Sequence, residues 1–138
     1  LFVRPRALVP DIPAAVLGGL GFVGLYCLSG FLPGEAGSVN DLVLAAGALG
    51  MWAVLDRTLL GLVIAGVTAA LGTAVEVTLV SHGIFAYLPR AANFFGVASW
   101  LPWLYIAAAV GVGSIARPIA AALEYVGHDK DHWKGELR

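Results

Sequence analysis

Residues 59–80 read LLGLVIAGVTAALGTAVEVTLV, an apolar run in which Glu76 is the only charged side chain. A helix needs about 20 mostly apolar residues to cross a hydrocarbon core about 30 Å thick, and this run is long enough. Its unbroken apolar character excludes the alternating pattern of a lipid-facing barrel strand. Backbone groups in lipid must also bond within their own segment, which a helix achieves. The stretch therefore predicts a membrane-spanning helix.

Three more stretches have the length and composition of spans or come close to it. They cover approximately residues 12–32, 40–55 and 100–116. Pro13 lies in the first turn of the first stretch, where proline is tolerated. Together with residues 59–80 they predict an all-α, polytopic transmembrane helical bundle. We expect one transmembrane domain over residues 1–138, with a cytoplasmic tail from about residue 117 to residue 138.

The composition agrees with a membrane protein. Hydrophobic residues make up 59% of the chain and charged residues 12%, against roughly a quarter charged in an ordinary soluble domain. A soluble globule of this length is mostly surface and could not bury so much apolar area. The net charge is −1 without basic or acidic blocks, which argues against a nucleic-acid partner. Because the chain starts at Leu1, we expect the natural N-terminus to lie upstream.

The basic residues predict the orientation of the bundle. With four crossings, the N-terminal arm, the turn near residue 57 and the C-terminal tail share one side of the membrane. The opposite side holds only Arg90 among the basic residues. The positive-inside rule therefore places both termini in the cytoplasm. The membrane would be the plasma membrane of a bacterium or the endoplasmic reticulum of a eukaryote. The residues on the cytoplasmic side are Arg4, Arg6, Arg57, Arg117, Lys130, Lys134 and Arg138.

Glu76 is the main candidate for function inside a span. An ionised carboxylate is energetically unfavourable in lipid and usually faces a polar cavity or a partner. Thr68, Gly72 and Glu76 recur at helical spacing and therefore share one face. Three interpretations remain open for Glu76: a hydrogen bond to a neighbouring helix, a contact to the head group of a bound ligand, or proton coupling in a small transporter.

Asp56 and Arg57 form a second candidate site, in the short turn between the second and third spans. They are either a local charge pair that ends one helix and starts the next, or a docking point for a membrane-protein partner.

The sequence offers little for catalysis or metal binding. The tail places His128 and His132 on one helical face, but the interleaved Asp129 and Lys130 suit a solvated tail, so we expect no metal site. The chain shows no nucleophile with a convincing base and no phosphate-binding loop. We therefore expect neither a catalytic residue nor a cofactor, and we predict a protein that is not an enzyme.

Four short segments resemble one known family. Residues 49–57, LGMWAVLDR, resemble a helix end in the insulin-induced gene protein (Insig) family, which closes on Phe-Asp-Arg. Residues 82–87, HGIFAY, are similar to the family's Asn-Gly-Val-Tyr-Gln-Tyr. Residues 99–102, SWLP, match its Ser-Trp-Leu-Pro, and residues 113–117, GSIAR, are similar to its Gly-Asn-Ile-Gly-Arg. The four segments occur in the family's order and at nearly its spacing.

The resemblance implies a bundle of six spans with cytoplasmic ends, of which the spans seen here are the last four. It also implies a regulator that is not an enzyme. In animals such proteins bind oxysterols within the bundle and hold sterol-sensing partners in the endoplasmic reticulum. The aspartate that matches Asp56 is implicated there in partner engagement. In the family's sterol-facing stretch a glutamine corresponds to Val77, and a threonine corresponds to Glu76.

We therefore expect a cavity that binds a neutral amphipathic lipid with a small hydroxyl-bearing head, such as a sterol or a diacylglycerol-like molecule. Isolated polar groups in an apolar interior are typical of such pockets. A proton-coupled transporter and a structural scaffold without a ligand are the alternatives. Stripes of small residues favour self-association, and we expect a homo-oligomer, with a trimer as the assumed state. The candidate ligand-binding residues are Thr68, Gly72, Thr73, Glu76, Val77 and Trp100.

Overall fold

The computed structural model describes residues 11–32 and 39–136, with side chains described as far as residue 123. This part of the chain forms four helices, which confirms the all-α prediction. They are α1 (Ile12–Phe31), α2 (Val39–Leu55), α3 (Leu59–Ser81) and α4 (Leu101–Glu136). Their bounds lie within one residue of the expected spans, except that α4 continues beyond residue 116.

Three of the helices are long and apolar enough to cross a membrane: α1, α3 and the part of α4 from Leu101 to Leu123. The fourth, α2, is apolar and 17 residues long, which is near the lower limit for a transmembrane helix. These helices make the chain an integral membrane protein.

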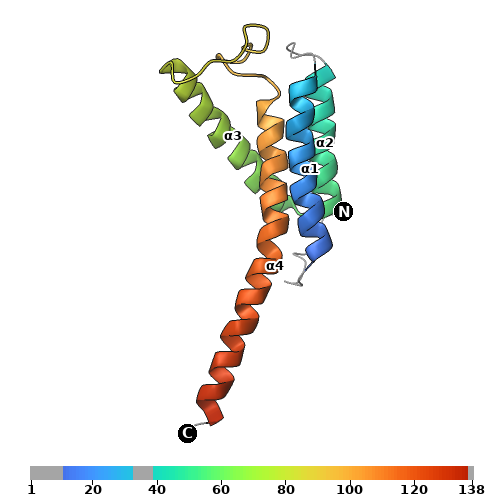
Figure 1. Ribbon diagram of the computed structural model, residues 1–138, viewed down its shortest axis with the longest axis vertical. Coiled ribbons are helices and arrows are strands. Elements are labelled where there is room, and N and C mark those ends of the chain that lie inside the picture. Colours follow the sequence, from blue (N-terminus) through green and yellow to red (C-terminus); the bar gives the residue numbers. More distant parts are fainter. Residues whose placement is uncertain (1–10, 33–38, 137–138) are drawn as a thin grey trace.

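Helix α4 is the centre of the bundle and packs against α1, α2 and α3 (Figure 1). Its closest approach to α1 involves two glycines. A Cβ atom on Gly111 would lie 2.9 Å from the carbonyl oxygen of Gly18, too close for any larger residue. Small residues of this kind let membrane helices pack backbone against backbone.

Helix α3 packs mainly on α4 and leans away from α1 and α2 toward its C-terminal end (Figure 1). Its face toward the bundle buries Ala65, Ala69 and Thr73, which are spaced four residues apart. Its other faces carry large apolar side chains that are each more than half exposed, as expected of side chains in contact with lipid. These are Leu60, Val63, Ile64, Val67, Leu71 and Val75.

Residues 82–100 connect α3 to α4 and form a folded loop, which we call the α3–α4 loop. Ala91, Ala98 and Trp100 of this loop pack with Leu44 of α2 in a buried cluster. The Ser99 hydroxyl donates a hydrogen bond to Asp41 at the start of α2 at 2.8 Å. The loop is therefore tied to α2 as well as to the two helices that it joins.

Candidate functional site

Glu76 lies where α3, the α3–α4 loop and α4 meet. The Tyr105 hydroxyl of α4 donates a hydrogen bond to Glu76 Oε1 at 2.8 Å. The Tyr87 hydroxyl of the α3–α4 loop donates to the other carboxylate oxygen, Oε2. One carboxylate thus joins three segments, and both of its oxygens are engaged.

Gly72 explains how Tyr105 reaches this carboxylate. A Cβ atom at Gly72 would lie 2.5 Å from Cε1 of Tyr105, so the tyrosine ring occupies the space that a side chain would need. Glu76 follows one helical turn later on the same face. The glycine therefore positions Tyr105 beside Glu76.

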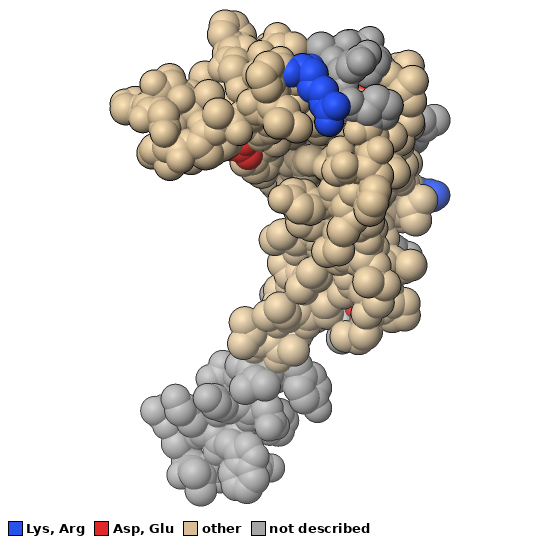
Figure 2. Space-filling view, turned by 45° about the horizontal axis from the view of Figure 1, so that its top comes forward, with Lys and Arg blue, Asp and Glu red and all other residues tan. Residues whose placement is uncertain are grey.

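A pocket of about 610 Å³ opens beside Glu76. It is bounded by α1, α3, α4 and the α3–α4 loop, and Glu76 is the only Asp, Glu, Lys or Arg among the described residues that line it. The space-filling view shows a hollowed, mostly uncharged face with acidic atoms visible in the hollow (Figure 2). The aromatic and aliphatic residues that line the pocket are Tyr26, Phe85, Tyr87, Trp100, Tyr105, Val75, Leu79, Leu101 and Leu104.

The polar groups around Glu76 favour a ligand group that donates a hydrogen bond. Tyr87 and Tyr105 already direct their protons to Glu76, so their oxygens and the remaining carboxylate lone pairs can only accept. Burial, and then the hydrogen bond to Glu76, raise the pKa of the Tyr87 hydroxyl above its ordinary value, which keeps this phenol protonated. An anionic group would be repelled by the carboxylate.

The structure brings together only part of the predicted ligand site. Glu76 and Trp100 line the pocket, and Gly72 supports it through Tyr105. Thr68, Thr73 and Val77 do not line this pocket.

Each of these three residues has a different environment on α3. The Thr68 hydroxyl donates to the backbone oxygen of Ile64 at 2.9 Å. Thr73 is buried, and its hydroxyl has no hydrogen-bond partner in the described part of the chain. Val77 is partly buried.

The sequence interpretation missed Tyr87 and Tyr105 as parts of the site. The available signal was a pair of phenol hydroxyls near the ends of apolar segments, since a buried tyrosine usually finds a hydrogen-bond partner. Their common partner could not be identified from spacing, because 11 positions separate Tyr87 from Glu76 and 29 separate Tyr105 from it.

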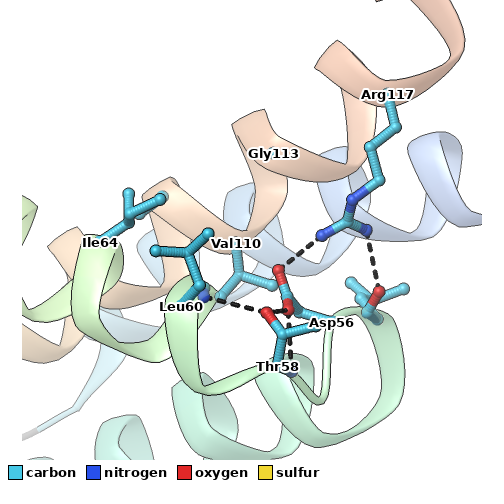
Figure 3. Close-up of a pocket in the computed structure, with 10 residues that line it drawn as sticks. Asp56, Thr58, Leu60, Ile64, Val110, Gly113 and Arg117 are labelled. Carbon is cyan, nitrogen blue, oxygen red and sulfur yellow. Dashed lines mark hydrogen bonds and ion pairs between the residues drawn. The ribbon is translucent and has the colours of Figure 1, made fainter. Parts of the chain in front are cut away.

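Asp56, at the opposite end of α3, forms an ion pair with Arg117 of α4. Arg117 Nη2 lies 2.5 Å from Asp56 Oδ2, and Nη1 donates to the backbone oxygen of Leu55 at 2.9 Å (Figure 3). Asp56 Oδ1 accepts from the backbone N–H of Thr58 at 2.9 Å and from the Thr58 hydroxyl. The carboxylate thus ties the α2–α3 turn to α4.

The expected local pair between Asp56 and Arg57 is not formed. Arg57 has a φ of 60°, a left-handed conformation that ends α2. Its exposed guanidinium donates instead to the backbone oxygen of Ala53. The pairing partner of Asp56 is Arg117, so the interpretation of a local charge pair was wrong.

The Asp56 carboxylate is largely covered by these contacts. Its side chain is 12% exposed, whereas that of Arg117 is 30% exposed. A pocket of about 320 Å³ lies beside the pair, between α3 and α4, with Leu60, Ile64 and Val110 in its walls (Figure 3). A protein that bound at this end would contact the surface of the α2–α3 turn more than the covered Asp56 carboxylate.

Metal binding has no support in the part of the chain that the structure describes. No group of three or more His, Cys, Asp or Glu residues there is placed to hold a metal ion. The side chains of His128 and His132 lie outside the described side chains.

Comparison with curated proteins places the chain beside insulin-induced gene 1 proteins. It is 36% identical over 99 residues to the protein of Danio rerio, which covers 72% of this chain and 39% of that protein. It is 34% identical over 99 residues to the human protein, with 72% of this chain and 35% of that protein covered. The chain thus spans well under half the length of these relatives. No protein-family model matches it.

Comparison with solved structures gives a consistent result. A mycobacterial Insig homologue from Mycobacterium vanbaalenii superimposes with a TM-score of 0.75 at 29% identity, covering 84% of this chain and 62% of that chain. A cross-linked trimer of that homologue gives the same TM-score at 30% identity and the same coverage. Likeness in sequence and likeness in structure therefore point to the same family.

Proposed function

The chain is a homologue of the insulin-induced gene proteins, and from this premise we propose that it is a membrane regulator that binds a neutral lipid and catalyses no reaction. The proposed ligand is an amphipathic lipid whose small head donates a hydrogen bond, such as a sterol or a diacylglycerol. Its head would lie at Glu76 and its apolar body along the aromatic and aliphatic wall of the 610 Å³ pocket.

One observation carries this proposal: Glu76, held by Tyr87 and Tyr105, lies in the wall of an otherwise largely apolar pocket. Ligand pockets are commonly apolar with a few placed polar groups that fix orientation. A hydroxyl head can donate to Glu76 or to a tyrosine oxygen. A phosphate head at Glu76 would meet a like charge without a compensating cation, because no Lys or Arg lines this part of the described structure.

Thermal unfolding of the detergent-purified chain tests the proposal. The protein would be titrated separately with an oxysterol, a diacylglycerol and phosphatidic acid. A lipid that binds only the folded state adds about 2.7 kcal/mol of stability at a hundredfold excess over its dissociation constant. We expect a shift with a hydroxyl-bearing lipid and none with phosphatidic acid. Equal shifts with all three lipids, or none with any, would refute specific binding at Glu76.

At the other end of the bundle, we propose that the α2–α3 turn docks a membrane-protein partner. The support is the resemblance of residues 49–57 to the family's helix end and the rigid geometry that Arg117 gives the turn. The distribution of basic residues supports a cytoplasmic location for this end. The role that we assign to Asp56 is to hold the shape of the turn, and exposed Arg57 would supply a direct contact.

We also propose that the chain forms a homotrimer. The support is the trimer of the mycobacterial homologue, to which this chain is similar, and the small residues along its helices. Mass measurement of the protein in native lipid discs would test this proposal, and a monomer at all protein concentrations would contradict it.

A further inference from the structure

The α3–α4 loop contains a tight turn with an unusual residue at its tip. Phe94 and Val97 exchange two backbone hydrogen bonds, each 3.0 Å long. The two residues between them, Phe95 and Gly96, have φ angles of 51° and 85°. Such two-residue turns normally carry Asn, Asp or Gly, because a positive φ brings a side chain too close to the backbone. A phenylalanine at this position is conformationally unfavourable and calls for an explanation.

Packing inside the protein does not supply that explanation. The Phe95 side chain is 78% exposed, and its ring makes an edge-on contact with Phe94, whose centroid is 4.9 Å away. Phe94 is itself 42% exposed. In the same loop, Ile84 and Leu88 are 67% and 62% exposed.

The loop therefore has two apolar faces. Its inner face, with Ala91, Val97 and Ala98, is buried against the bundle. Its outer face carries exposed Phe94 and Phe95 although it lies outside any span. Loops that face water expose polar side chains, so an exposed apolar outer face indicates contact with another apolar medium.

We propose that the outer face of the α3–α4 loop lies in the lipid bilayer, with Phe95 inserted beneath the head groups. The loop joins Ser81 at the end of α3 to Leu101 at the start of α4, so it lies near the level where head groups meet hydrocarbon. Aromatic side chains are enriched at this level of membrane proteins.

The charge of the loop fits a lipid surface. Residues 82–100 contain no Asp or Glu, and Arg90 is the only Lys or Arg among them. Arg90 is exposed, and its guanidinium suits the phosphate groups of phospholipids. The apolar tip thus suits the hydrocarbon layer of a bilayer, and the nearby guanidinium suits its head-group layer. This inference does not depend on any ligand in the Glu76 pocket.

Spin labels on the full chain in phosphatidylcholine–phosphatidylglycerol vesicles test the proposal. Cys27 is the only cysteine, so a Cys27→Ser background allows a single nitroxide to be placed through Phe95→Cys. Leu71→Cys, on the exposed face of α3, is the control for lipid, and Arg90→Cys is the control for the head-group level. Relaxation by oxygen, which concentrates in lipid, and by a water-soluble nickel chelate reports the environment of each label.

We expect the Phe95 label to resemble the Leu71 label, with relaxation by oxygen several-fold stronger than by nickel. The Arg90 label should respond more to nickel than the Phe95 label does. Equal responses of the Phe95 and Arg90 labels to nickel would place the tip no deeper than the head groups and overturn the proposal. Protection of the Phe95 label from both reagents would also overturn it, because a protein would then cover the tip.

A tryptophan at the tip provides a second measurement if the label disturbs the turn. Phe95→Trp should add fluorescence that bromine-labelled acyl chains quench, beyond the quenching of the parent chain with its 4 tryptophans. No additional quenching in a folded variant would contradict insertion.

Discussion

Arg117 and Asp56 are 61 positions apart in the chain, yet the guanidinium of one lies 2.5 Å from the carboxylate of the other. This contact is the polar tie between the α2–α3 turn and the central helix, and Arg117 strengthens it by a second hydrogen bond to Leu55. At the other end of α3, Glu76 joins α3 to Tyr105 of α4. Helix α3 is thus held to α4 by a carboxylate near each end.

Removing the guanidinium of Arg117 should destabilise the bundle. Arg117→Met leaves the mostly covered Asp56 carboxylate without its counter-charge. We expect a loss of about 1–2 kcal/mol, less than for a fully buried pair because Arg117 is partly exposed. Chemical unfolding in detergent, followed by circular dichroism, would measure it. Arg57→Met is the matched control, since Arg57 is exposed in the same turn. Equal losses in both variants would contradict the role assigned to Arg117.

A methyl group at Gly72 should reduce the stability of the protein, because Tyr105 packs against this position. The added Cβ atom in Gly72→Ala would lie 2.5 Å from the tyrosine ring, and overpacking of this kind costs about 1–3 kcal/mol. The matched control on the same helix is Gly66→Ala, because nothing lies within 4 Å of a Cβ there. We expect that control to be neutral or slightly stabilising, since alanine has the higher helix propensity. Thermal unfolding of the two variants checks the prediction, which fails if both behave alike.

Thr73→Val should leave stability unchanged or increase it by up to about 2 kcal/mol. The Thr73 hydroxyl is buried without a hydrogen-bond partner in the described structure, and burial of an unsatisfied polar group is unfavourable. Valine has nearly the same shape and lacks that group. The midpoint of thermal unfolding, measured without added lipid, checks this. A marked loss of stability would mean that the hydroxyl has a partner, such as a bound water or lipid.

The spans were predictable because length and hydropathy alone specify a transmembrane helix. It was also predictable that Glu76 would have polar partners, because a carboxylate in an apolar run needs a compensating environment. The end of α4 was not predictable in the same way. The apolar window of that helix ends at Leu123, whereas the helix continues to Glu136, so hydropathy does not indicate where the helix stops.

Sequence patterns could not identify the partners of the Glu76 and Asp56 carboxylates. Spacing along a helix identifies neighbours three or four residues away, but Tyr105 and Arg117 come from another helix. One of the two interpretations of Asp56 paired it with adjacent Arg57, and that interpretation was wrong because the left-handed conformation of Arg57 turns its side chain back toward Ala53. Only the packing of α4 against α3 brings the true partners together.

The most direct test of the account is the stabilisation of the parent chain and of Glu76→Gln by a diacylglycerol, measured as the shift in the midpoint of thermal unfolding. Thr68→Val serves as the control, because Thr68 does not line the pocket. A hydrogen bond to a charged group is worth about 1.5–3 kcal/mol, so the dissociation constant should rise at least tenfold in Glu76→Gln and stay unchanged in Thr68→Val. Equal shifts in all three proteins would contradict a lipid head group at Glu76.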